Sequence, residues 1–122
     1  MGRKLYERIT CLDGFSMSVQ AGEHGYSSPQ EDDASSYTQV EVGYPSAIDD
    51  LLMPYVEDRS KPTLTVYPYV PMEVVEQVIL SHGGVIDGEL PPGYRIDIVY
   101  PNRKRRPRSK WAKTVRRIKT TR

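Results

Sequence analysis

The chain has 122 residues, with seventeen Lys and Arg against sixteen Asp and Glu, and its formal net charge is +1. This length allows one small domain with a tail rather than two domains. The single cysteine, Cys11, excludes an internal disulfide and a cysteine-based zinc cage. The sequence contains no apolar run of membrane-spanning length and no signal-peptide core near its beginning, so we expect a cytoplasmic protein without membrane contact.

The first predicted element is a β-hairpin. Residues 4–12 have strand character, and Asp13-Gly14 favours a tight turn because both residues tolerate positive φ. Residues 15–21 then alternate apolar and polar side chains, which is the period of a half-buried strand. An acidic loop rich in Gly and Ser is expected over residues 22–36.

A third strand and a short helix are predicted next. Residues 37–43 alternate again and indicate a strand. Ser46 and Asp49 have the spacing of a helix-capping pair, and the helix is expected to end before Pro54. The residues expected to face the core from this helix are Ile48, Leu51 and Leu52.

A fourth strand and a longer helix follow. Residues 63–70 alternate, and Pro68 within them requires a sheet edge or a bulge because proline cannot donate to a strand ladder. Pro71 suits the first turn of a helix, and the His-Gly-Gly sequence at residues 82–84 ends it. The apolar stripe of this helix consists of Val74, Val75, Val78 and Ile79.

The last predicted element of the body is a strand over residues 94–100, after a stiff turn at residues 90–93. The resulting order, β-β-β-α-β-α-β, predicts an α+β domain with its helices on one face of a mostly antiparallel sheet. We place this domain at residues 1–102.

Charge is divided unequally between this domain and the end of the sequence. Residues 1–102 contain six bases and all sixteen acids, a formal charge of −10, whereas residues 103–122 contain eleven bases and no acid. Such asymmetry is typical of an interaction tail, most often one that meets nucleic acid. We refer to residues 103–122 as the basic arm.

The basic arm combines an extended linker with a short amphipathic helix. Residues 103–108 contain a proline and dense like charge, and Ser109 can cap a following helix in which Trp111, Val115 and Ile118 share one face. Such a short helix is unstable alone in water, so it should fold against something. The residues predicted to contact nucleic acid are Arg103, Lys104, Arg105, Arg106, Arg108, Lys110, Trp111, Lys113, Arg116, Arg117 and Lys119.

Several short stretches carry a resemblance to a known family. They are Ser16-Met17-Ser18-Val19-Gln20-Ala21, Tyr26 with Pro29, Val40-Glu41-Val42-Gly43-Tyr44-Pro45-Ser46, Val66-Tyr67 with Val70-Pro71, and His82-Gly83-Gly84. Over residues 13–84 the chain resembles a family of small, uncharacterised tailed-bacteriophage proteins. The resemblance implies a phage or prophage product acting in a bacterial host cell, and it implies no activity and no functional residues.

The body offers little catalytic or metal-binding chemistry. Cys11 with His24 or His82 would be the only thiol–imidazole pairing, and neither histidine lies in a recognisable motif. The acidic residues 31–33 and 49–50 match no EF-hand or other metal motif, so we expect solvated charges and neither metal nor cofactor.

Aromatic side chains could in principle add a nucleic-acid surface to the body. Tyr67 and Tyr69 are predicted to share one strand face, where they could stack on bases. The acidic body repels phosphate, however, so packing or protein contact is the favoured role for these tyrosines.

The sequence therefore predicts a non-enzymatic binding protein whose basic arm engages nucleic acid, DNA or RNA, or a ribonucleoprotein complex. The alternative is a protein–protein interaction module that acts through its acidic body. Such a module could inhibit a host or defence complex, or it could assemble with itself through opposite charges. In a third arrangement, the arm folds onto the body of the same molecule, and its positive charges pair with the negative charges of the body.

Overall fold

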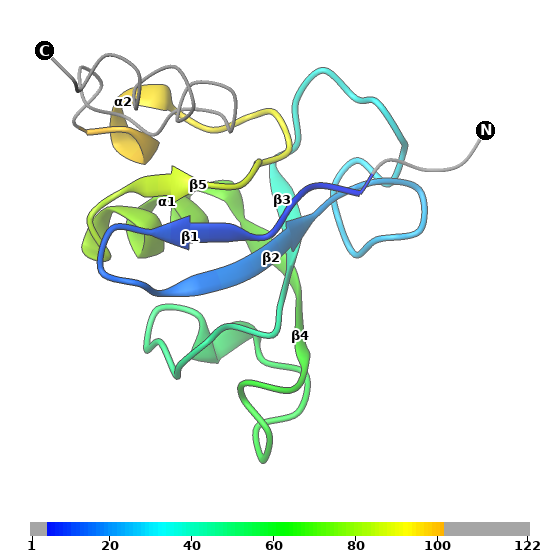
Figure 1. Ribbon diagram of the computed structural model, residues 1–122. Helices are drawn as coiled ribbons and strands as arrows, with labels where there is room; N and C mark the ends of the chain where they lie inside the picture. The colour runs from blue at the N-terminus through cyan, green and yellow to red at the C-terminus, as the bar shows by residue number, and fades with distance from the viewer. Residues whose placement is uncertain (1–4, 102–122) are drawn as a thin grey trace, which may run out of the picture.

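The computed structural model describes residues 5–101 (Figure 1). Its centre is a five-stranded sheet in which every neighbouring pair is antiparallel, in the order β4-β3-β2-β1-β5. The strands are β1 (Ile9–Cys11), β2 (Ser16–Gln20), β3 (Gln39–Gly43), β4 (Val66–Pro71) and β5 (Val85–Asp87). The helices are the 3₁₀-helix η1 (Met53–Tyr55) and the α-helices α1 (Met72–Ser81) and α2 (Ile96–Val99). The predicted α+β class is confirmed.

The first hairpin forms as predicted, with a turn of slightly different geometry. Ile9 pairs with Met17, and the N–H of Gly14 donates to the carbonyl of Cys11 at 2.9 Å. Gly14 has a φ of 97°, and Asp13 instead uses its side chain to accept a hydrogen bond from the N–H of Phe15 at 2.9 Å. The turn therefore needs positive φ only at the glycine.

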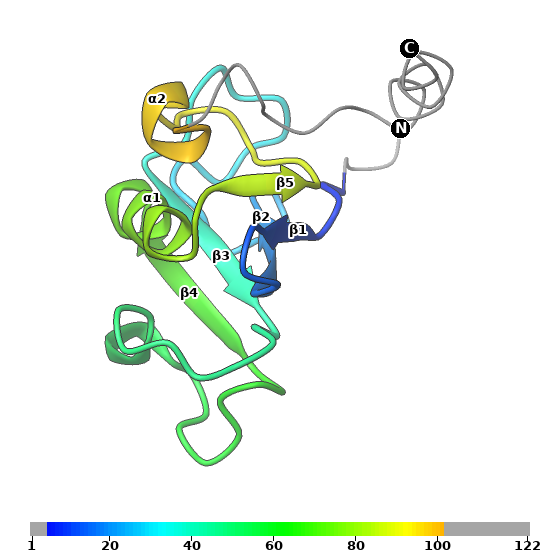
Figure 2. The same cartoon turned by 60° about the vertical axis from the view of Figure 1, so that its left-hand side comes forward.

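One face of the sheet is apolar and is covered by α1 (Figure 2). Alternate residues of the strands point into this core, because side chains of a strand alternate between the two faces. The stripe of α1 packs on them as predicted, with Val75, Val78 and Ile79 fully buried and Val74 partly buried. Helix α2 lies beside α1 and adds the buried Val99 to the same core.

Strand β4 lies at an edge of the sheet and also contains a bulge, so both expectations for Pro68 are confirmed. Val40 pairs with Val70 and Val42 with Tyr67, so one extra residue is accommodated on β4. The bulge breaks the predicted alternation. Tyr67 is buried, while Tyr69 is exposed and has a φ of 54°.

The predicted helix after Ser46 does not form. The Ser46 hydroxyl accepts a hydrogen bond from the N–H of Ser16 at 3.0 Å, and Asp49 Oδ1 accepts one from the N–H of Leu51 at 2.9 Å. Both capping side chains are therefore used elsewhere. Of the three expected core residues only Leu52 is buried, and the only helix here is η1, which contains Pro54.

The predicted last strand is also wrong. Residues 94–100 contain α2 instead, and the fifth strand is β5, which the sequence did not indicate. Arg95 is anchored to α1 by two hydrogen bonds to the Glu76 carboxylate. Its backbone N–H donates at 2.7 Å and its Nε donates at 3.0 Å. This anchor turns the chain toward α1, and the single helical turn that follows buries Val99 there.

Helix α1 ends in two glycines, as predicted. The N–H of Gly84 donates to Ile79 at 2.9 Å and that of Gly83 to Leu80 at 3.1 Å, and both glycines have a φ of 93°. This pattern is a Schellman motif. The ring of Pro101 lies directly against Gly84, since a Cβ there would be 2.7 Å from the proline Cδ.

Candidate functional site

The site predicted from the sequence lies outside the described residues. This applies to the eleven predicted contacts, to the predicted arm helix and to the domain boundary after residue 102. The contacts in question are Arg103, Lys104, Arg105, Arg106, Arg108, Lys110, Trp111, Lys113, Arg116, Arg117 and Lys119. What the structure describes is the acidic body that carries the arm.

The described body is strongly anionic. Residues 5–101 contain all sixteen acids and four bases, a formal charge of −12. Two of these bases are held by the body itself. Arg8 donates to the carbonyl of Tyr44 at 2.6 Å, and Arg95 pairs with Glu76. The other two lie in the exposed loop between η1 and β4 and are Arg59 and Lys61.

An open cavity beside α1 does not suit a phosphate. It is an open depression of about 320 Å³ beside the beginning of α1, and its lining includes Glu73, Glu76 and Arg95. Because the buried Glu76 carboxylate already engages Arg95, the charges there are balanced or negative. Phosphate oxygens would meet one shared cation and two carboxylates.

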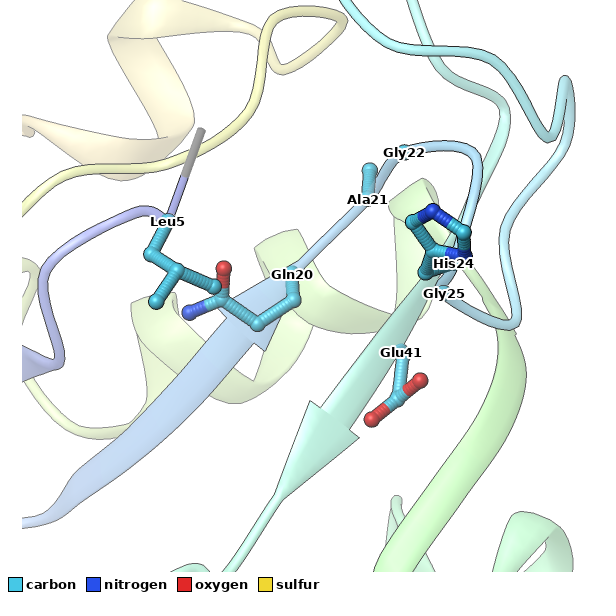
Figure 3. Close-up of a pocket in the computed structure, with 7 residues that line it drawn as sticks. All are labelled: Leu5, Gln20, Ala21, Gly22, His24, Gly25 and Glu41. Carbon is cyan, nitrogen blue, oxygen red and sulfur yellow. The ribbon is translucent and has the colours of Figure 1, made fainter. Parts of the chain in front are cut away.

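A smaller pocket opens between the N-terminal segment, the end of β2 and β3 (Figure 3). Gln20, His24 and Glu41 are its polar lining. Its volume of about 50 Å³ has room for one or two waters rather than a nucleobase. Glu41 is also engaged, since its Oε1 accepts a hydrogen bond from the N–H of Tyr26 at 3.0 Å.

The most organised polar group of the body is a histidine held between two carboxylates. His82 Nδ1 lies 2.6 Å from Asp13 Oδ2, and His82 Nε2 lies 2.8 Å from Asp49 Oδ2. The ring also stacks on Phe15, with centroids 4.0 Å apart and planes within 6°. We call Asp13, His82 and Asp49 the histidine clamp. It joins the first hairpin, the loop after β3 and the end of α1.

The clamp favours the charged imidazolium. Partial burial opposes the charge, but the hydrogen bonds to Asp13 and Asp49 outweigh it, so the pKa of His82 is raised above 6.5. The hydrogen bond from His82, together with the N–H of Phe15, lowers the pKa of Asp13 below 3.8. Because both ring nitrogens then act as donors, the clamp is a structural ion pair and offers no free base.

Sequence reasoning missed this clamp. His82 lies at the end of α1, in agreement with the predicted helix end at residues 82–84. Its partners, however, are 69 and 33 residues away in sequence. No local sequence pattern predicts contacts between residues so far apart.

The thiol–imidazole pairing considered for Cys11 does not provide a nucleophile. Cys11 is buried on β1, and burial, with the nearby charges of Asp13 and Asp49, raises its pKa to about 12. A thiolate is the reactive form, so this side chain behaves as a small apolar core residue. His82 is already occupied by the clamp.

The tyrosines considered for base stacking are separated by the bulge in β4. Tyr67 is buried, and its hydroxyl donates to the carbonyl of Pro62 at 2.6 Å. Tyr69 instead packs near Tyr26, with ring centroids 5.8 Å apart, and both rings are partly exposed. Tyr26 and Tyr69 therefore form a surface aromatic pair that the sequence did not predict.

The described part of the chain contains no group of three or more His, Cys, Asp or Glu side chains arranged to hold a metal ion. Among residues 5–101, no helix has the length and apolar character needed to cross a membrane. Comparison of the chain with protein-family models, with curated proteins and with solved structures found no match.

Proposed function

We propose that this chain is a non-enzymatic phage-type binding protein of a bacterial host cell, and that its basic arm engages nucleic acid or a ribonucleoprotein complex. The observation that supports this proposal is the division of charge. The described body has a formal charge of −12, and two of its four bases are held by the body itself. Eleven of the seventeen Lys and Arg residues of the chain lie within residues 103–122.

This division predicts how binding depends on salt. Phosphates dominate the affinity of basic proteins for nucleic acid, because each neutralised phosphate releases counterions. If about six phosphates are neutralised, affinity falls roughly a thousandfold between about 50 and 200 mM salt. The acidic body repels the same backbone, which keeps the contact confined to the arm.

The test measures fluorescence anisotropy of labelled DNA and RNA duplexes and single strands with the full chain. One variant replaces Arg103, Lys104, Arg105 and Arg106 by Gln, and its matched control replaces the two exposed body bases Arg59 and Lys61 by Gln. The arm variant should lose at least tenfold in affinity and show a shallower salt dependence, whereas the control should change little. Equal losses in both variants, or salt-independent binding, would contradict the proposal.

A second candidate function is protein recognition through the acidic body. The surface pair Tyr26 and Tyr69 favours it, because exposed aromatic rings are enriched at protein interfaces and Tyr69 is held there in a rarely used backbone conformation. Sizing the protein with and without nuclease, at low and at high salt, separates the two functions. Co-purifying nucleic acid supports the first, and salt-sensitive complexes free of nucleic acid support the second.

A further inference from the structure

Three exposed aliphatic side chains lie close in sequence to the two carboxylates of the histidine clamp. Leu12 is 63% exposed and precedes Asp13, while Ile48 and Leu51 are 61% and 45% exposed and flank Asp49. Because both carboxylates contact the His82 ring, the two segments that carry these side chains are held at one end of the sheet. We call Leu12, Ile48 and Leu51 the clamp patch.

One member of the clamp patch, Leu12, lies near the point where the described chain ends. The N–H of Leu12 donates to the carbonyl of Gly84 at 3.0 Å, and a Cβ at Gly83 would be 2.8 Å from the Leu12 Cβ. The ring of Pro101 packs against Gly84. Leu12 and Pro101 therefore contact two adjacent glycines, so the last described residue lies near this member of the clamp patch.

The length of the segment that follows Pro101 is compatible with docking on this patch. Residues 102–110 precede Trp111, and an extended chain spans about 3.3 Å per residue. This linker reaches roughly 30 Å at most. It allows the predicted helix to turn back onto the end of the sheet.

The same segment fits the patch in chemistry. Its predicted apolar face, Trp111, Val115 and Ile118, offers three apolar side chains to the three of the patch. The clamp itself retains one net negative charge when His82 is protonated, and the neighbouring Asp50 is exposed. A basic amphipathic helix is thus complementary to both the apolar and the charged character of the surface.

We propose that the apolar face of residues 111–118 docks on the clamp patch of the same molecule. The docked segment turns its bases, which include Lys113, Arg116 and Arg117, away from the body. The body then supplies the packing that so short a helix needs, and the bases form one outward face. The docking does not depend on nucleic-acid binding, although it would present the arm in a form suited to phosphates.

The single tryptophan of the chain makes this docking measurable. Quenching of Trp111 fluorescence by acrylamide, a neutral quencher, is compared between the full chain and a free peptide of residues 103–122. In the full chain the quenching constant should be several-fold lower than in the peptide. An equal value in both would overturn the proposal.

Surface variants test the position of the docking. Leu12→Ser and Leu51→Ser should each raise the quenching constant toward that of the peptide. The matched control is Leu5→Ser, because Leu5 is also 63% exposed but precedes the other end of β1. Circular dichroism establishes that all three variants remain folded. An unchanged constant in both patch variants, or an equal rise in the control, would overturn the assignment to the clamp patch.

Dilution shows whether the segment docked on the clamp patch belongs to the same molecule or to a second copy. Docking within one molecule gives a quenching constant that is independent of protein concentration, whereas docking onto a second copy weakens on dilution and would overturn the proposal as stated. Anisotropy with labelled DNA and RNA is measured on the same variants. If the unmodified full chain binds nucleic acid but does not shield Trp111 from acrylamide, the docking alone is contradicted. If it shields Trp111 but does not bind, only the proposed function is contradicted.

Discussion

Replacing Asp49 with asparagine should destabilise the body far more than the same replacement at its neighbour Asp50. Asp49 is 9% exposed and accepts a hydrogen bond from the charged His82 ring at 2.8 Å. A hydrogen bond to a charged group contributes about 1.5–3 kcal/mol, and the neutral bond that Asn can keep contributes about 0.5–1.5 kcal/mol. We therefore expect a loss of about 1–2 kcal/mol for Asp49→Asn, against less than about 0.5 kcal/mol for Asp50→Asn.

The pH dependence of this difference follows from the direction of the pKa shifts. The pKa of His82 is raised above 6.5, so its contribution is complete below that pH and is lost as the pH rises through the folded value. The pKa of Asp13 is lowered below 3.8, so its contribution is present above 3.8 and is lost as the pH falls through the folded value. The clamp is strongest between these limits.

The assay is thermal unfolding followed by circular dichroism at about pH 5.5 and about pH 9. For a domain of this size, about 1–2 kcal/mol corresponds to a fall in Tm of roughly 5–15 °C. Asp49→Asn should show this fall at the lower pH, and its gap from Asp50→Asn should narrow at the higher pH. Equal shifts in the two variants, or a gap that does not change with pH, would refute the reasoning.

Three further predictions concern other described residues. The pKa of Cys11 is raised to about 12, so the thiolate fraction at about pH 8 should be on the order of 10⁻⁴. A thiol reagent should therefore label Cys11 only as the protein unfolds, and rapid labelling of the folded protein would contradict this. Gly84→Ala should lower the free energy of unfolding in urea by about 2–4 kcal/mol, because the added methyl group overlaps the Pro101 ring and the backbone there is left-handed. Gly14→Ala should lower it by only about 1–2 kcal/mol, because only the left-handed backbone opposes the substitution, and equal losses would argue against the contact of Gly84 with Pro101. Tyr37→Phe should cost about 1–2 kcal/mol, because the buried hydroxyl donates to the carbonyl of Glu31 at 2.6 Å, and an unchanged unfolding midpoint would be inconsistent with that bond.

Elements with local signals were predictable from the sequence. The first hairpin and α1 combine a regular apolar period with a glycine at the required turn or cap position, and both form. Pro68 likewise indicated a sheet edge or a bulge, and β4 has both. In these places local preference and tertiary packing agree.

The later elements depend on distant partners and were mispredicted. Strand β5 has three residues, of which only Val85 is buried, so its period carries almost no information. It exists because β1 offers a free edge to pair with. The alternation of residues 94–100 equally suits a single helical turn, and the contact of Arg95 with Glu76 selects that turn.

The same distinction applies to the candidate sites. The charge of the basic arm is visible in composition alone, because it needs no fold to be recognised. The histidine clamp and the clamp patch arise where three separate segments meet, and their members are ordinary turn and loop residues in the sequence. Only the folded chain brings them together.

The edge strand β4 restricts how any partner can recognise this body. Pro68 has no N–H to offer, the carbonyl of Val66 already accepts from the N–H of Glu57 at 3.1 Å, and the N–H of Tyr69 already donates to Tyr26 at 3.1 Å. The opposite edge, β5, is three residues long. Within the described residues, the sheet therefore offers little backbone to which a foreign strand could be added, and β-augmentation and edge-to-edge aggregation are both disfavoured. A partner of the body has to recognise its side chains.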